Sequence, residues 1–99
     1  MAKDIERIEV ENINSPHHKV RVDAAKYNAM RAALMAVLPD AAPGLTPTEA
    51  IAALRPGLPA DLFPGGEKAG WWMKCLQLDL EAKGVIRRAD KPPVRLWRV

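Results

Sequence analysis

The chain has 99 residues, of which 48% are hydrophobic and 27% are charged. This composition is typical of one soluble globular domain, and it excludes two domains, a disordered chain and a disulfide scaffold. The single cysteine, Cys75, has no partner for an internal disulfide, and no apolar run approaches the roughly 20 residues of a membrane span. Because the first residues also lack the apolar segment of a signal peptide, we expect a reduced, cytoplasmic protein that does not enter a membrane.

The charge is unevenly distributed along the sequence. The net charge is +3, but residues 1–66 carry seven Lys and Arg against eight Asp and Glu, whereas residues 67–99 carry eight against four. A basic C-terminal segment can bind phosphates or an acidic protein, and it can also be a solvated edge. Both interpretations stay open from composition alone.

Two short extended stretches are expected before the first helix. Residues 5–13 alternate polar and apolar around Ile8 and Val10, and residues 19–22 alternate again after a turn at residues 14–16. We therefore expect residues 1–22 to form an N-terminal arm or short strands, and residues 23–99 to form the main part of one compact domain.

Two helices are predicted next. The first begins after Asp23, a suitable N-cap residue, and ends before Pro39, with apolar residues at helical spacing between them. The second begins at Thr46, where Glu49 three residues later completes a capping box, and it ends at residues 55–57. Residues 57–66 are expected to form a loop.

The third predicted helix covers about residues 67–83 and ends at Gly84. Its helical wheel has three parts: an apolar face with Ala69, Trp72, Met73, Leu76 and Leu80, a second apolar face with Trp71, Cys75, Leu78 and Ala82, and a polar strip with Gly70, Lys74, Gln77 and Glu81. Residues 85–88 and 94–99 then predict a hairpin with a loop at residues 89–93. The second apolar face is expected to be covered by the N-terminal arm or by a second copy of the chain.

The end of the third helix and the following strand carry a family resemblance. The sequence Leu76-x-x-x-Leu80-Glu81-Ala82-Lys83-Gly84-Val85-Ile86-Arg87-Arg88 resembles the same region of many winged helix-turn-helix domains. The motifs Val22-Asp23-x-x-x-Tyr27, Gly70-Trp71-Trp72 and Gln77-Leu78-Asp79-Leu80-Glu81 look like those of a small bacterial family of uncharacterised single-domain proteins. The expected fold is thus mainly α with a small β component, a three-helix winged helix-like domain with a C-terminal β-hairpin.

The winged helix resemblance implies nucleic-acid binding, such as that of a transcriptional regulator, with the third helix in the major groove and the hairpin on the backbone. The residues that would contact duplex DNA are Lys74, Gln77, Arg87, Arg88, Lys91 and Arg95, with Glu81 on the same strip. The alternative is a protein-interaction or dimerisation module without nucleic-acid binding. It is favoured by Glu81, which repels phosphate, and by a segment between the second and third helices that is longer than a compact helix-turn-helix turn. A nucleic-acid-binding domain of this kind is expected to be a homodimer, because one wing module gives limited contact area, and the dimer interface would use Trp71, Cys75 and Leu78.

The remaining chemistry-bearing residues predict no enzyme, metal site or cofactor. His17 and His18 are adjacent and are expected to be exposed turn residues, because a closed zinc site needs four suitably spaced ligands. Cys75 is expected to be a buried structural thiol, and Asp79 is expected to form a structural ion pair, either with Lys83 at i+4 or with an arginine of a strand. The three tryptophans, Trp71, Trp72 and Trp97, are expected in core or interface packing before base stacking.

Overall fold

The computed structural model describes residues 6–15, 17 and 19–99 as one domain of three helices and two antiparallel strand pairs. The chain order is β1 (Arg7–Val10), β2 (Val20–Asp23), α1 (Ala24–Val37), α2 (Pro47–Leu54), α3 (Ala69–Ala82), β3 (Ile86–Arg88) and β4 (Leu96–Arg98), with short 3-10 turns at Arg55–Gly57 and Pro64–Gly66. This is the predicted mixture of helices with a small β component. Ile5 and His18, which the sequence interpretation included, lie outside the described residues.

Helices α1 and α2 begin at the positions that their capping residues predict. Asp23 accepts a hydrogen bond from the Lys26 N–H at 3.1 Å, which satisfies a free donor in the first turn of α1. At α2, the Glu49 N–H donates to Thr46 Oγ1 at 3.2 Å and the Thr46 N–H donates to Glu49 Oε1 at 2.9 Å. The capping box is therefore confirmed in both directions.

The end of α3 has the hydrogen bonds of a Schellman motif. The Val85 N–H donates to the Leu80 carbonyl at 2.9 Å, and the Gly84 N–H donates to the Glu81 carbonyl at 3.2 Å. Gly84 has a φ of +74°, the left-handed conformation that glycine adopts without strain. The helix begins at Ala69, two residues later than expected, because Lys68 has a φ of +60° and cannot belong to it.

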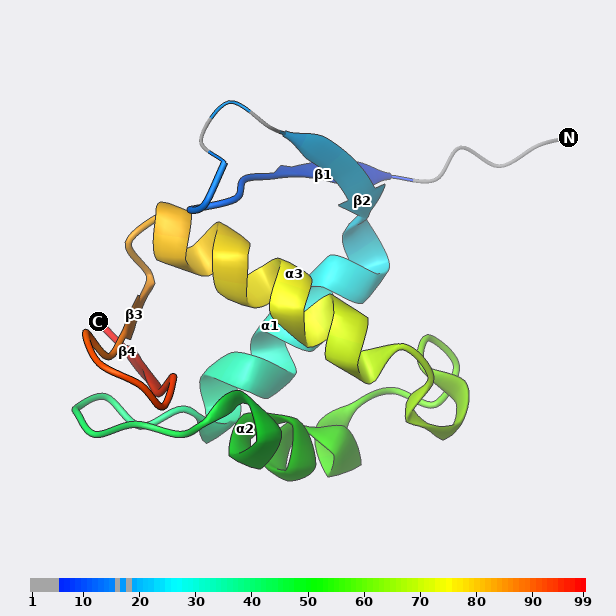
Figure 1. The fold of residues 1–99 in the computed structure, drawn as a ribbon. Coiled ribbons are helices and arrows are strands. Elements are labelled where there is room, and N and C mark those ends of the chain that lie inside the picture. Colours follow the sequence, from blue (N-terminus) through cyan, green and yellow to red (C-terminus); the bar gives the residue numbers. More distant parts are fainter. Residues whose placement is uncertain (1–5, 16, 18) are drawn as a thin grey trace, which may run out of the picture.

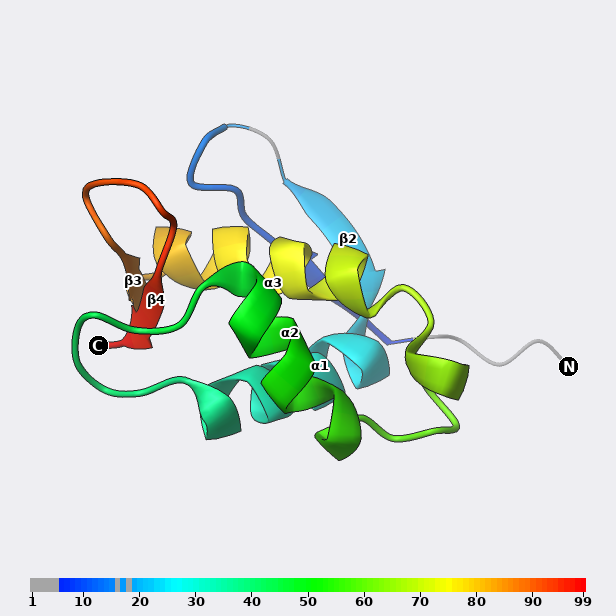
Figure 2. The ribbon, with the colours of Figure 1, turned by 60° about the horizontal axis from the view of Figure 1, so that its bottom comes forward.

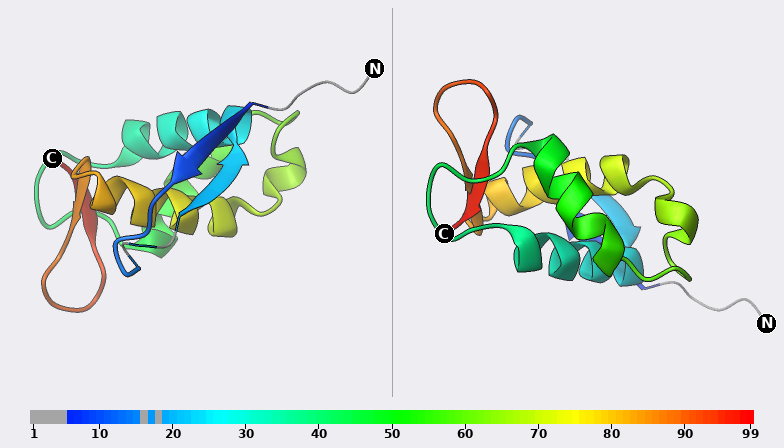
Figure 3. Two further views of the ribbon diagram at one scale, coloured as in Figure 1. Left: turned by 90° about the horizontal axis from the view of Figure 1, so that it is seen from above. Right: turned by 90° about the horizontal axis from the view of Figure 1, so that it is seen from below.

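Two hairpins lie at opposite ends of the sequence and contact different parts of α3. The N-terminal hairpin pairs β1 with β2, with Val10 opposite Val20, and runs along α3 (Figure 1). The C-terminal hairpin pairs β3 with β4, with Arg87 opposite Trp97, at the C-terminal end of α3. In Figures 2 and 3 the loops of both hairpins extend to the same side of α3.

The loop between α1 and α2 extends the C-terminal hairpin by one bridge. Leu45 and Leu96 exchange backbone hydrogen bonds at 2.9 and 2.7 Å. Gly44 precedes this bridge with a φ of +78°, and a Cβ there would lie 2.2 Å from the Leu96 carbonyl oxygen. Only glycine fits this close approach. The sequence interpretation assigned this loop no role in the sheet.

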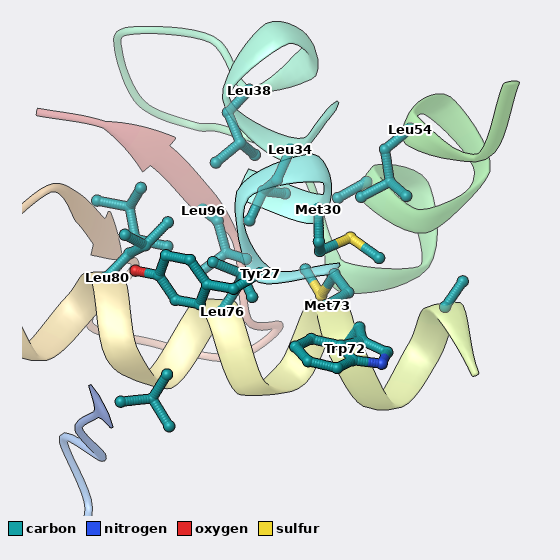
Figure 4. Close-up of a cluster of buried hydrophobic side chains, with 14 of the residues drawn as sticks. Tyr27, Met30, Leu34, Leu38, Leu54, Trp72, Met73, Leu76, Leu80 and Leu96 are labelled. Carbon is teal, nitrogen blue, oxygen red and sulfur yellow. The ribbon is translucent and has the colours of Figure 1, made fainter. Parts of the chain in front are cut away.

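The core lies between α1, α2 and α3, and the C-terminal hairpin closes one end of it. Figure 4 shows that α1 and α3 face each other across the buried side chains and that Leu96 reaches them from β4. The buried residues of these elements include Tyr27, Met30, Leu34, Leu54, Trp72, Met73, Leu76, Leu80, Ile86 and Leu96. The first apolar face of α3 is thus confirmed as the core face, and its other faces provide the candidate site.

Candidate macromolecular interface

The polar strip predicted on α3 is only partly a surface. Gln77 is fully buried, and its Nε2 donates to Glu81 Oε2 at 3.1 Å. On the helical wheel Gln77 lies only about 40° from the core residue Met73, and its hydrogen-bond partner Glu81 pairs with Arg88 of β3. The expectation that Gln77 faces outward to contact DNA is therefore wrong.

Glu81 is also turned away from solvent by the C-terminal hairpin. Its side chain is 7% exposed, and Glu81 Oε1 lies 3.2 Å from Arg88 Nε in an ion pair between α3 and β3. Arg88 thus compensates a nearly buried carboxylate, which is a structural task that the sequence interpretation did not assign to it. Of the three helix side chains expected to face DNA, only Lys74 is exposed.

The outward side of α3 is more apolar than expected of a helix that reads bases. Trp71 is 59% exposed, and the edge of its ring packs at 5.1 Å between centroids against Trp72, which is buried. Cys75 and Leu78 are half-buried beside it. The N-terminal hairpin therefore covers part of the second apolar face, as one of the two predicted options requires, and leaves Trp71 largely uncovered.

An apolar groove lies between the N-terminal hairpin and α3. It has a volume of about 310 Å³ and is lined by Val10, Glu11, Asn12, Val20, Trp71, Lys74, Cys75 and Leu78. We call it the apolar groove. Burial raises the pKa of the Cys75 thiol to about 11, so this side chain lines the groove as a protonated, weakly reactive thiol. Cys75 was expected to be a buried structural thiol, but it is half-buried and borders the surface.

A second groove lies at the C-terminal hairpin. It has a volume of about 670 Å³ and is lined by Ile13, Glu81, Ile86, Arg87, Arg88, Ala89, Asp90, Lys91, Pro92, Val94 and Trp97. We call it the basic groove, because three of its residues are cations. Arg87 and Lys91 are exposed, whereas Arg95 lies outside this lining and its Nη1 is 3.7 Å from Glu49 Oε1. Trp97 is half-buried in the groove wall.

The two grooves are neighbours on one side of the molecule. Glu11 and Asn12 line the apolar groove, and the next residue of the same connection, Ile13, lines the basic groove. On α3, Leu78 lines the apolar groove and Glu81 lines the basic groove, and residues three apart on a helix are surface neighbours. The loops of both hairpins project on this side, as Figures 2 and 3 show. We call the combined surface the α3 face.

The N-terminal hairpin is held in this position by a buried carboxylate. Asp79 is fully buried, and its oxygens accept hydrogen bonds from the Glu11 N–H at 2.8 Å, from the Tyr27 hydroxyl, and from Lys83 Nζ at 3.0 Å. The predicted Asp79–Lys83 ion pair is confirmed, at 2.9 Å between Nζ and Oδ1. Burial, and then the hydrogen bond to Asp79, raises the pKa of Tyr27 far above that of a free tyrosine. This cluster joins β1, α1 and α3, and so fixes one wall of the apolar groove.

The sequence predicted the N-terminal arm as one of two possible covers of the second apolar face, but not that the hairpin would line a groove there. Alternation around Ile8 and Val10 predicted the strands, but it contained no signal for the place where the hairpin packs. Its tip adds two exposed apolar residues to this side of the domain, Ile13 and Val20. The only signal in the sequence was the second apolar face of α3, which required a cover.

The described residues contain no group of three or more His, Cys, Asp and Glu side chains that could hold a metal ion. His17 is exposed, as expected of a turn residue. In the part of the chain that the structure describes, no helix has the length and apolar character needed to cross a bilayer.

Comparison with known proteins gives a family and no activity. The model of one protein family, described as a family of unknown function, matches residues 7–96, which include every helix, the N-terminal hairpin, β3 and the first residue of β4. No curated protein and no solved structure matches the chain.

Proposed function

Because the chain belongs to this family of unknown function, DUF6958, its role has to be inferred from its surface, and we propose that the domain binds another protein through the α3 face. The observation that carries the proposal is the exposed ring of Trp71 at the edge of the apolar groove. Tryptophan is enriched among the residues that dominate binding energy at protein interfaces. An exposed aromatic beside a groove that can receive a side chain favours that use.

The chemistry of α3 supports a protein partner over a base-reading role. Sequence readout in the major groove needs donors and acceptors that reach the base edges. Gln77 is buried and Glu81 is engaged by Arg88, so Lys74 is the one predicted reading residue that reaches solvent. The outward residues next to it, Trp71 and Leu78, offer apolar contact instead.

Binding of the nucleic-acid backbone is a second candidate, favoured by a specific observation at the C-terminal hairpin. Arg87 and Lys91 are exposed there and, among the described residues, take part in no ion pair. The order of three helices followed by a basic hairpin also supports the resemblance to winged helix domains, in which the hairpin contacts phosphates.

A bacterial source and a cytoplasmic location stay predictions of the sequence.

The proposed protein binding is tested with a phage-displayed library of random peptides selected against the immobilised wild-type domain. Peptides that occupy the α3 face should lose about tenfold or more in affinity for Trp71→Ala, because the aromatic anchor is removed. The matched control is Arg31→Ala, which changes an exposed residue of α1 and should leave binding unchanged. A selection that yields no binder, or only binders that ignore Trp71→Ala, would overturn the proposal.

The second candidate is tested by fluorescence anisotropy of a labelled DNA duplex over a salt series. If the hairpin contacts phosphates, Arg87→Ala/Lys91→Ala should reduce the slope of log affinity against log salt by up to about two units. Arg31→Ala/Arg55→Ala removes the same charge from exposed positions elsewhere and should leave the slope unchanged. A folded protein that does not bind duplex DNA at low salt would eliminate this candidate.

A further inference from the structure

We infer that the segment bound at the α3 face is an extended, acidic stretch of another protein, with one large apolar side chain in the apolar groove and carboxylates against Arg87 and Lys91. This inference rests on the proposed function and specifies the chemistry of the partner. The volume of the apolar groove, the charge of the basic groove and the distance between the two grooves determine which partner fits.

The volume of the apolar groove limits what can enter it. At about 310 Å³ it is at the lower end of the range of roughly 300–1,000 Å³ seen for ligand sites, so it accommodates a single large side chain and not a helix about 10 Å wide. Its walls provide an aromatic ring from Trp71 and aliphatic surface from Val10, Val20 and Leu78. An apolar side chain carried on an extended backbone suits this shape.

The basic groove supplies the complementary charge. Glu81 is nearly buried and engaged by Arg88, so the cations that remain without ion pairs among the described residues of the two grooves are Lys74, Arg87 and Lys91. An aspartate or glutamate of the partner would form charge-assisted hydrogen bonds with these side chains. The acidic residues on the same surface, Glu11 and Asp90, limit the excess of positive charge and favour a partner with few carboxylates.

The positive charge also selects between an acidic partner and a second copy of the chain. In a two-fold symmetric dimer the same patch of both copies forms the interface, so the cations Lys74, Arg87 and Lys91 of both copies would gather there. Among the described residues of this surface, only Glu11 and Asp90 of each copy would offset them. Like charges that face each other are unfavourable. The small apolar groove offers little area against the roughly 800 Å² that each partner of a stable complex buries.

The geometry of α3 sets the spacing of the partner's residues. Trp71 lines the apolar groove, and Glu81 lines the basic groove together with Arg87 and Lys91. The two α3 residues are ten positions apart, so at a rise of about 1.5 Å per residue these walls of the two grooves are about 15 Å apart along the helix axis. An extended chain rises about 3.3 Å per residue, so it covers this distance in about four or five residues. The expected motif is a large apolar residue with Asp or Glu about four or five positions away.

The test repeats the peptide selection with a charge-reversed domain. Peptides selected by the wild-type domain should carry Asp or Glu about four or five residues from an apolar anchor, and Arg87→Glu/Lys91→Glu should instead select Lys or Arg at that distance while keeping the anchor. Both substitutions are at exposed hairpin positions, and circular dichroism checks the fold of the variant. The control is Arg31→Glu, which should select the wild-type motif.

The outcomes separate this inference from the proposed function. Peptides that depend on Trp71 but show no acidic preference, or a preference unchanged by charge reversal, would overturn the acidic partner and leave protein binding intact. If the selection yields no peptide whose binding depends on Trp71, both the acidic partner and the proposed protein binding are overturned. A concentration-dependent dimer that Trp71→Ala dissociates, measured by sedimentation velocity, would identify a second copy as the occupant and would also overturn the inference.

Discussion

Replacing Asp79 with asparagine tests whether the buried carboxylate holds the N-terminal hairpin. Asp79→Asn keeps the side-chain volume but removes the charge that accepts from the Glu11 N–H, the Tyr27 hydroxyl and Lys83 Nζ. Breaking a buried ion pair costs about 3–5 kcal/mol, and the lower end applies because the Lys83 side chain is 34% exposed and regains water. We expect a loss of about 3 kcal/mol, a large part of the roughly 5–15 kcal/mol that stabilises a domain of this size.

A double-mutant cycle assigns the effect to the cluster. Tyr27→Phe removes one hydrogen bond to a charged acceptor and should cost about 2 kcal/mol in the free energy of unfolding, measured by urea titration followed by tryptophan fluorescence. The double variant should lose about 1 kcal/mol less than the two single losses combined, because the residues share one interaction. Strict additivity, or an Asp79→Asn protein as stable as the wild type, would refute the role of Asp79 in holding the N-terminal hairpin.

Other predictions concern the caps, the loop bridge and the titrating groups. Thr46→Ala should cost about 1 kcal/mol by urea titration, and an unchanged midpoint would refute the role of the cap. Gly44→Ala should cost at least about 2 kcal/mol and remove amide-exchange protection at Leu45, because its Cβ would collide with the Leu96 carbonyl; retained protection would contradict this. Because the pKa of the Cys75 thiol rises from 9.0 to about 11, its thiolate fraction near neutral pH falls about 100-fold, and since a more basic thiolate is also more nucleophilic, its reaction with a disulfide reagent should be on the order of tenfold slower than that of an ordinary cysteine. The pKa of Tyr27 is raised in the folded protein, so its protonated hydroxyl contributes its full stability below pH 10.0, the ordinary pKa, and this contribution should be lost as the pH rises further. Tyr27→Phe should therefore lose less stability at alkaline pH than the wild type. An equal loss in both proteins would contradict this.

The elements that the sequence predicts best are those with local signals. Asp23, Thr46 and Gly84 act on backbone groups within a few residues, so their hydrogen bonds follow from the order of residues alone. The core face of α3 is equally predictable, because its apolar residues recur at helical spacing.

The features that were missed depend on packing between distant segments. The helical wheel placed Gln77 on the polar strip, but Gln77 is fully buried, because the width of the buried arc of α3 depends on how segments distant in sequence, such as β3, pack against it. The bridge between Leu45 and Leu96 joins a loop to a strand about 50 residues later, and neither residue carries a local signal for it. The apolar groove likewise exists only after the N-terminal hairpin packs on α3.

The most direct test of protein binding at the α3 face is an amide NMR titration of the nitrogen-labelled domain with the tightest peptide from the selection. We predict that the Trp71 indole signal and the backbone amides of Lys74, Leu78 and Arg87 shift most, since they surround the two grooves. A separate apolar groove of about 330 Å³ lies between α1 and α2, with Ala36 in its lining. Largest shifts at that groove, with the Trp71 indole unchanged, would contradict the proposed interface.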